Sequence, residues 1–69
     1  MRNRKYLYKA IVWYTFSASK SSTVYYITSP GYSAAVGKAE RIFHNKHPYW
    51  EKITSIKCTL LGLLYDAKN

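Results

Sequence analysis

The sequence predicts a small α+β domain, in which a three-stranded antiparallel sheet carries one helix on one face. Three observations predict this fold. Residues 5–16 and 23–28 are rich in aromatic and β-branched residues and contain neither glycine nor proline, which is typical of strands. Residues 34–46 follow a helical period and end before Pro48. Residues 51–61 again have the composition of a strand, so the element order is β-β-α-β within one domain that spans residues 1–69.

The first two strands are expected to form a β-hairpin. Residues 17–22 (SASKSS) are small and polar, so they are predicted to be the loop between the strands. The tripeptide at residues 29–31 (Ser-Pro-Gly) then breaks the strand pattern.

The helix has an apolar stripe and a basic ridge. Ser33 is the predicted N-cap, because its hydroxyl can accept a hydrogen bond from an amide one turn further on. The stripe consists of Val36, Ala39, Ile42 and Phe43, with Ala35 at its edge. The ridge consists of Lys38, Arg41 and Asn45, with Lys46 nearby. Gly37 weakens the helix by about 1 kcal/mol relative to alanine, and we attribute it to close packing of the helix on the sheet.

A right-handed crossover through the helix can carry the third strand past the first. The predicted sheet order is therefore second, first, third strand. Side chains alternate between the two faces of a sheet, and the even-numbered residues of the first strand carry no charge. Even-numbered residues are expected to face the helix, including Val12 in the first strand and Ile56, Cys58 and Leu60 in the third. The second strand stays ambiguous, because Val24 with Tyr26 and Tyr25 with Ile27 are both apolar sets.

The opposite sheet face is predicted to mix aromatic and basic residues. It carries Lys9, Ile11, Trp13 and Lys57, with Tyr25 or Tyr26 beside them. The chain holds eight tyrosines, two tryptophans, eleven Lys/Arg and three Asp/Glu, with a net charge of +8. Lysine and arginine near phosphates release condensed counterions, and aromatic rings stack on unpaired bases at about 1–3 kcal/mol per base.

These features predict a nucleic-acid-binding protein, for single-stranded DNA or RNA without strong sequence preference. The N-terminal residues 1–4 are expected to form a basic arm, which either reaches phosphates or is solvated. The predicted binding residues are Arg2, Arg4, Lys5, Lys9, Trp13, Tyr25 and Lys57.

Two other functions stay open. One is a protein-binding module or inhibitor that docks onto the acidic surface of a larger protein, as in the small basic accessory proteins of phages. The other is a structural homo-oligomer that buries the outer face against its own copy. Residues 62–69 form an apolar tail that is expected to fold back or to bury against a second copy. A chain of this size buries only about 60% of its unfolded surface, so extra support from a partner is expected.

Enzymatic, metal and membrane functions are not expected. The glycines at Gly31, Gly37 and Gly62 are scattered, so they form no phosphate-binding loop. His44 and His47, with Cys58 far along the chain, are too few ligands for zinc, and no cofactor is predicted. The lone cysteine excludes an intrachain disulfide and favours a cytoplasmic location. Lys9 interrupts the early apolar run, which argues against a signal peptide, and no apolar run approaches the ~20 residues of a membrane-spanning helix.

Overall fold

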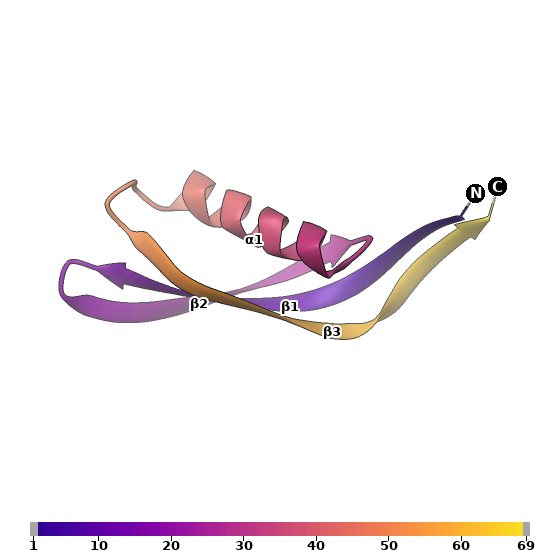
Figure 1. The fold of residues 1–69 in the computed structure, drawn as a ribbon, viewed down its shortest axis with the longest axis horizontal. Helices are drawn as coiled ribbons and strands as arrows, with labels where there is room; N and C mark the ends of the chain where they lie inside the picture. Colours follow the sequence, from indigo (N-terminus) through magenta and orange to yellow (C-terminus); the bar gives the residue numbers. More distant parts are fainter. Residues whose placement is uncertain (1, 69) are drawn as a thin grey trace.

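The structure of the protein, a computed structural model, describes the backbone of residues 2–68 and the side chains of residues 4–63. Its elements are β1 (Arg2–Phe16), β2 (Ser19–Ser29), α1 (Tyr32–Lys46) and β3 (Lys52–Lys68). The strands form one antiparallel sheet in the order β2-β1-β3, and α1 lies across one face of it (Figure 1). The predicted α+β fold and the β-β-α-β order are confirmed. No helix in the described chain is long and apolar enough to cross a membrane.

The core lies between α1 and the sheet. It consists of Tyr8, Ala10, Val12, Ile27, Ala35, Ala39, Phe43 and Cys58. The predicted helix-facing set of β1 is confirmed in the middle of the strand, where Tyr8, Ala10 and Val12 are buried, whereas Phe16 at its end is 48% exposed. Val36, Ile42 and Ile56 pack against this core but are only partly buried. Leu60, expected under the helix, is instead 56% exposed, since it pairs with Tyr8 at the sheet edge where nothing in the described chain covers it.

Close packing of the helix depends on alanine, and the interpretation of Gly37 is wrong. Ala35 and Ala39 are fully buried against the sheet. Gly37 is exposed, and a β-carbon placed there would meet no neighbouring atom within 4 Å. Gly37 therefore lowers helix propensity without any packing contact that would require it.

Pairing resolves the ambiguity of the second strand. Tyr25 pairs with Ala10, and Ile27 pairs with Tyr8, so both face the helix. Val24 and Tyr26 lie on the opposite face of the sheet.

The loop predicted at residues 17–22 is wrong, because β2 begins at Ser19. Phe16 pairs with Ser19, so only Ser17 and Ala18 form the turn. Ser17 has a φ of 58°, in the left-handed region that usually takes glycine or asparagine. The sequence lacks those turn residues, which is why it indicates a longer loop.

The helix begins at Tyr32, and its N-cap is Gly31 rather than the predicted Ser33. The buried Ser29 hydroxyl donates to the Gly31 carbonyl oxygen over 2.8 Å and accepts from the Gly31 amide over 3.3 Å. The Gly31 carbonyl oxygen also accepts from the Ala35 amide over 3.0 Å. The serine that organises the helix start is thus the last residue of β2.

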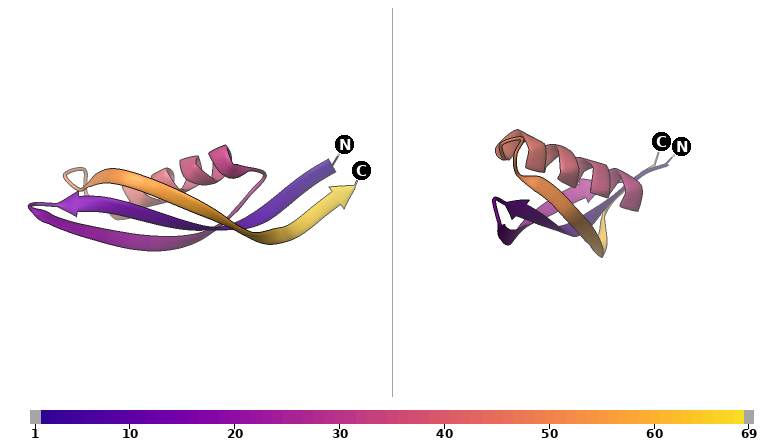
Figure 2. Two further views of the ribbon diagram at one scale, coloured as in Figure 1. Left: turned by 60° about the horizontal axis from the view of Figure 1, so that its bottom comes forward. Right: turned by 60° about the vertical axis from the view of Figure 1, so that its left-hand side comes forward.

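The residues predicted as an arm and a tail form a ribbon instead. Residues 2–5 of β1 pair with residues 65–68 of β3, while Met1 and Asn69 lie outside the described residues. The tail thus folds onto its own domain as a continuation of β3. The pairing skips Thr54, Leu61 and Leu64, which are bulges in β3. The ribbon extends past α1 and β2, as Figure 2 shows, and the molecule measures 49 × 19 × 15 Å.

Candidate nucleic-acid interface

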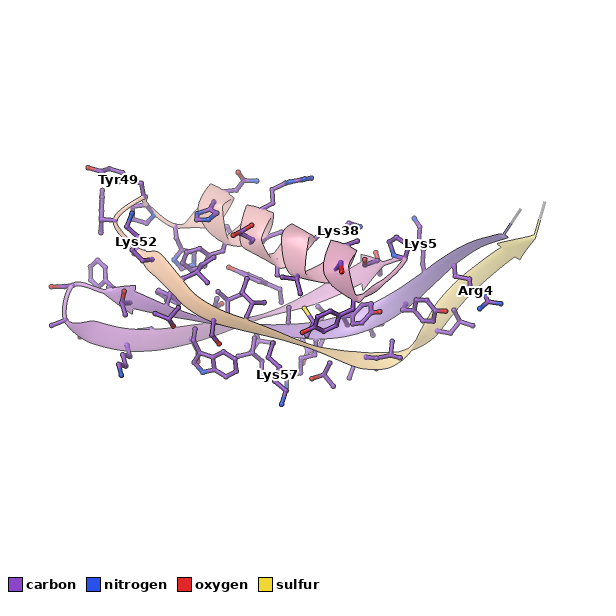
Figure 3. The ribbon with its side chains drawn as sticks, viewed as in Figure 1. Arg4, Lys5, Lys38, Tyr49, Lys52 and Lys57 are labelled. Atoms are coloured by element: carbon purple, nitrogen blue, oxygen red, sulfur yellow. The ribbon has the colours of Figure 1, made fainter. Side chains whose placement is uncertain are left out.

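The sheet face opposite α1 presents ordered rows of three side chains, one from each strand. We call this surface the outer face. Its rows are Tyr26–Lys9–Thr59, Val24–Ile11–Lys57 and Ser22–Trp13–Ser55. Figure 3 shows Lys57 pointing away from the helix. The outer face is therefore built from β1 in the centre, with β2 and β3 on either side.

Among the side chains of residues 4–63, two aromatic rings are accessible on the outer face. Tyr26 is 66% exposed and Trp13 is 38% exposed. They are separated by four residues along the strands and by one strand across, a distance of about 14 Å. Val24 and Ile11 fill the row between them, so the two rings stand at the ends of an apolar strip.

Trp13 is held at a fixed place in the sheet. The Thr54 hydroxyl donates to the Trp13 carbonyl oxygen over 3.1 Å, at the bulge where β3 shifts its register. Ser22 and Ser55 pair with Trp13 from its two sides, and both are exposed. The indole therefore lies between two hydroxyl groups that can donate or accept hydrogen bonds.

The charge of the outer face is positive. Lys9 and Lys57 lie in its rows, and exposed Lys20 pairs with Thr15 in the next row. Among the side chains of residues 4–63, no carboxylate belongs to these rows. Glu51 lies outside the sheet, with its Oε1 atom 2.7 Å from His47 Nδ1. An anionic ligand would thus meet lysines on this face without an opposing acid.

The predicted site residues divide into three groups. Lys9, Trp13 and Lys57 come together on the outer face, as expected. Arg4 and Lys5 lie on the extended ribbon (Figure 3), and the Arg2 side chain lies outside the described residues. Tyr25 faces the helix, so its placement on the outer face is wrong, and Tyr26 takes that position.

Tyr25 is part of the packing around the core. The Lys46 ammonium lies 5.8 Å from the centre of its ring, within the range of a cation–π interaction. The Tyr25 hydroxyl is buried and makes no hydrogen bond with any of the described residues. Its surroundings therefore suit the ring of a phenylalanine better than that of a tyrosine, whose hydroxyl is left without a partner.

Two lysines on or near the basic ridge of the helix contact residues of β2 within the same domain. The Lys38 ammonium donates to the Thr28 carbonyl oxygen over 2.7 Å, and Lys46 lies over Tyr25. Arg41 and Asn45 are exposed. Two of the helix lysines thus stabilise the contact with β2, which weakens the case for the ridge as a phosphate-binding surface.

His47 is the C-cap residue that directly follows the helix. The His47 ring stacks on Phe43, with ring centres 4.1 Å apart, and meets Tyr14 edge-on at 5.0 Å. Its amide donates to the Phe43 carbonyl oxygen over 2.9 Å.

The described residues contain no group of three His, Cys, Asp or Glu that could hold a metal. Burial raises the pKa of the Cys58 thiol, so its reactive thiolate form is disfavoured.

Three accessible residues were missed or underrated by sequence reasoning. Tyr26 lies on the outer face, where the strand pattern leaves its orientation open. Tyr49 and Trp50, in the loop before β3, are 82% and 54% exposed, and their rings meet edge-on at 5.3 Å. Figure 3 shows Tyr49 at the end of the molecule away from the ribbon. Two aromatic residues directly after Pro48, outside any period, are the signal that could have identified this pair.

No protein family matches the chain, and no curated protein and no solved structure is significantly similar to it. A function for the outer face has to be argued from its own chemistry.

Proposed function

We propose that the protein binds single-stranded nucleic acid, DNA or RNA, through the outer face. The observation that carries the proposal is the exposure of Trp13 and Tyr26 on one open sheet face whose charged side chains are lysines. Aromatic rings supply stacking platforms for bases, and lysines neutralise the phosphates between them.

A single strand fits this surface better than a duplex does. The bases of a duplex are stacked on each other, so they cannot lie on Trp13 or Tyr26 without being unpaired first. A flexible single strand can place one base on each ring and cross the apolar strip of Ile11 and Val24. Lys9 and Lys57 would then approach its backbone.

Weak sequence preference is also expected. Base edges are usually read by arginine, asparagine or glutamine in bidentate contacts, and the rows of the outer face contain none of these residues. The hydroxyls of Ser22 and Ser55 can bond to several base edges, because each can donate or accept. Stacking itself tolerates every base.

The stacking contribution is tested by tryptophan fluorescence with a labelled single-stranded oligonucleotide. Trp50 is more exposed than Trp13, so the titration uses a Trp50→Phe background in which Trp13 alone reports. We expect quenching on binding, and we expect Trp13→Ala to weaken binding by about 1–3 kcal/mol with little change in salt dependence. Unchanged affinity of Trp13→Ala would contradict the stacking mechanism.

The electrostatic contribution is tested by the same titration across a salt series. Lys9→Ala and Lys57→Ala should each lower the salt slope by about one unit for each phosphate that the removed lysine neutralises. Arg41→Ala removes the same charge from an exposed position on the helix and is the matched control. If Arg41→Ala lowers the slope as much as Lys9→Ala does, the attraction comes from the net charge and not from the outer face.

A further inference from the structure

The two edges of the sheet differ in how they are protected. At the β2 edge, Lys38 reaches down from α1 and bonds to the Thr28 carbonyl oxygen. At the β3 edge, no strand of the described chain pairs with the far side. Residues 55–60 of β3 pair with β1 without interruption, between the bulges at Thr54 and Leu61. An uninterrupted edge of this kind offers backbone amides and carbonyls to an additional strand.

The helix side of this edge is apolar. Ile56 and Leu60 lie on that side by their pairing with Val12 and Tyr8. Ile56 is partly buried against the core, whereas Leu60 is 56% exposed. Leu61 and Leu63 follow along the same strand with similar exposure. A β-carbon at Gly62 would meet nothing within 4 Å, so none of the described atoms covers the sheet face at that position.

The outer side of this edge is polar and positive. Ser55, Lys57 and Thr59 are exposed there, and Lys57 projects away from the helix (Figure 3). Acidic side chains of an added strand would be attracted near Lys57.

We propose that the edge of β3 at residues 55–60 pairs with an extended segment of a protein partner, in which apolar residues alternate with acidic ones. The apolar residues would face the helix side and cover Ile56 and Leu60, and an acidic residue would meet Lys57. Backbone hydrogen bonds supply affinity in such pairing, and the alternating side chains supply specificity. This edge shares Lys57 with the outer face, but it does not include the two aromatic residues Trp13 and Tyr26. A second copy is a poorer occupant, because each chain carries a net charge of +8.

The proposal is tested by titrating the isotope-labelled full chain with short synthetic peptides and following its backbone amides by NMR. One peptide alternates valine with glutamate, and the matched peptide alternates valine with lysine. We expect the glutamate peptide to shift the amides of residues 55–60 and to slow their hydrogen exchange, with no such effect from the lysine peptide. Lys57→Glu should reverse this preference, because the charge opposite the peptide is inverted.

Variants of exposed apolar residues locate the contact. Leu60→Asp should lower the affinity for the glutamate peptide about tenfold or more. Phe16→Asp, a similarly exposed position at the hairpin end of β1, should leave it unchanged. Circular dichroism verifies that both variants are folded.

Four results would overturn the proposal: no binding of the glutamate peptide, equal binding of both peptides, shifts confined to β2, or a doubled mass in solution that Leu60→Asp abolishes. The last would assign the edge to a second copy. None of these results depends on nucleic-acid binding, so the two proposals fail separately.

Discussion

Tyr25 and Tyr26 are neighbours in sequence with opposite environments. The alternation of β2 turns Tyr26 to the outer face, where it is 66% exposed. Tyr25 turns toward the helix, where its ring lies near Lys46 and its hydroxyl is buried without a hydrogen-bond partner among the described residues. A buried donor and acceptor that lacks a partner costs about 1–3 kcal/mol. The two positions therefore form a matched pair for the same substitution.

We expect Tyr25→Phe to raise the free energy of unfolding by about 1 kcal/mol, because it removes the buried hydroxyl and keeps the ring. Urea denaturation followed by circular dichroism measures the change. Tyr26→Phe removes an exposed hydroxyl and should leave stability unchanged. A loss of stability in Tyr25→Phe would show that the hydroxyl is hydrogen-bonded in solution.

At the scale of elements, α1 combines close packing with weak intrinsic helix formation. Ala35 and Ala39 are fully buried, which brings the helix close to the sheet, and Phe43 fills the space beside Tyr14 and His47. The N-cap residue is Gly31, which has no side chain to cap the first amides of the helix, and the first turn holds no acidic residue. Exposed Gly37 adds a further cost in the middle of the helix. The helix thus depends on its contact with the sheet.

Gly37→Ala should raise the free energy of unfolding by about 0.5–1 kcal/mol, because alanine has the higher helix propensity and its methyl group has open space. Thermal or urea unfolding of the variant and the original chain measures this difference in the free energy of unfolding. The reverse change at a buried position, Ala39→Gly, should lower stability by at least as much. If Gly37→Ala destabilises the domain, a contact at Gly37 that the structure does not show must exist.

At the scale of the whole molecule, the first residues of β1 and the last residues of β3 lie together on a two-stranded ribbon that extends beyond the helix (Figures 1 and 2). Tyr6 pairs with Leu63 and Leu7 pairs with Gly62, so the ribbon joins the sheet without a break in β1. The basic residues at the start of the chain are held in a strand by the end of the chain. Their position relative to the outer face therefore depends on β3.

Deletion of residues 62–69 should lower the free energy of unfolding by about 3 kcal/mol or more, since it removes the ladder hydrogen bonds of six residue pairs, with a net contribution of about 0.5–1.5 kcal/mol for each bond. Urea denaturation measures the decrease, and sedimentation measures the mass. Deletion of residues 67–69 alone should have a much smaller effect, because it removes only the end of the ribbon. Identical unfolding of the longer deletion and the full chain would mean that the ribbon contributes no stability.

Local patterns determined most of the fold. The uncharged even-numbered residues of β1 predicted its buried face, and the stripe with Ala39 and Phe43 predicted the buried face of α1, because alternation and helical period are properties of a short segment. The same reasoning placed Lys9, Trp13 and Lys57 together. These predictions needed no knowledge of distant contacts, apart from the handedness of one crossover.

Only the tertiary structure decided the rest. Both faces of β2 are apolar, so Tyr25 and Tyr26 could be told apart only by pairing with β1, whose register follows from the turn at Ser17. Residues 62–68 are a strand because residues 2–7 pair with them. Lys38 and Lys46 contact Thr28 and Tyr25 because β2 lies beside the helix. Hydrogen bonds between residues far apart in sequence set register, strand ends and exposure, and no local pattern carries that information.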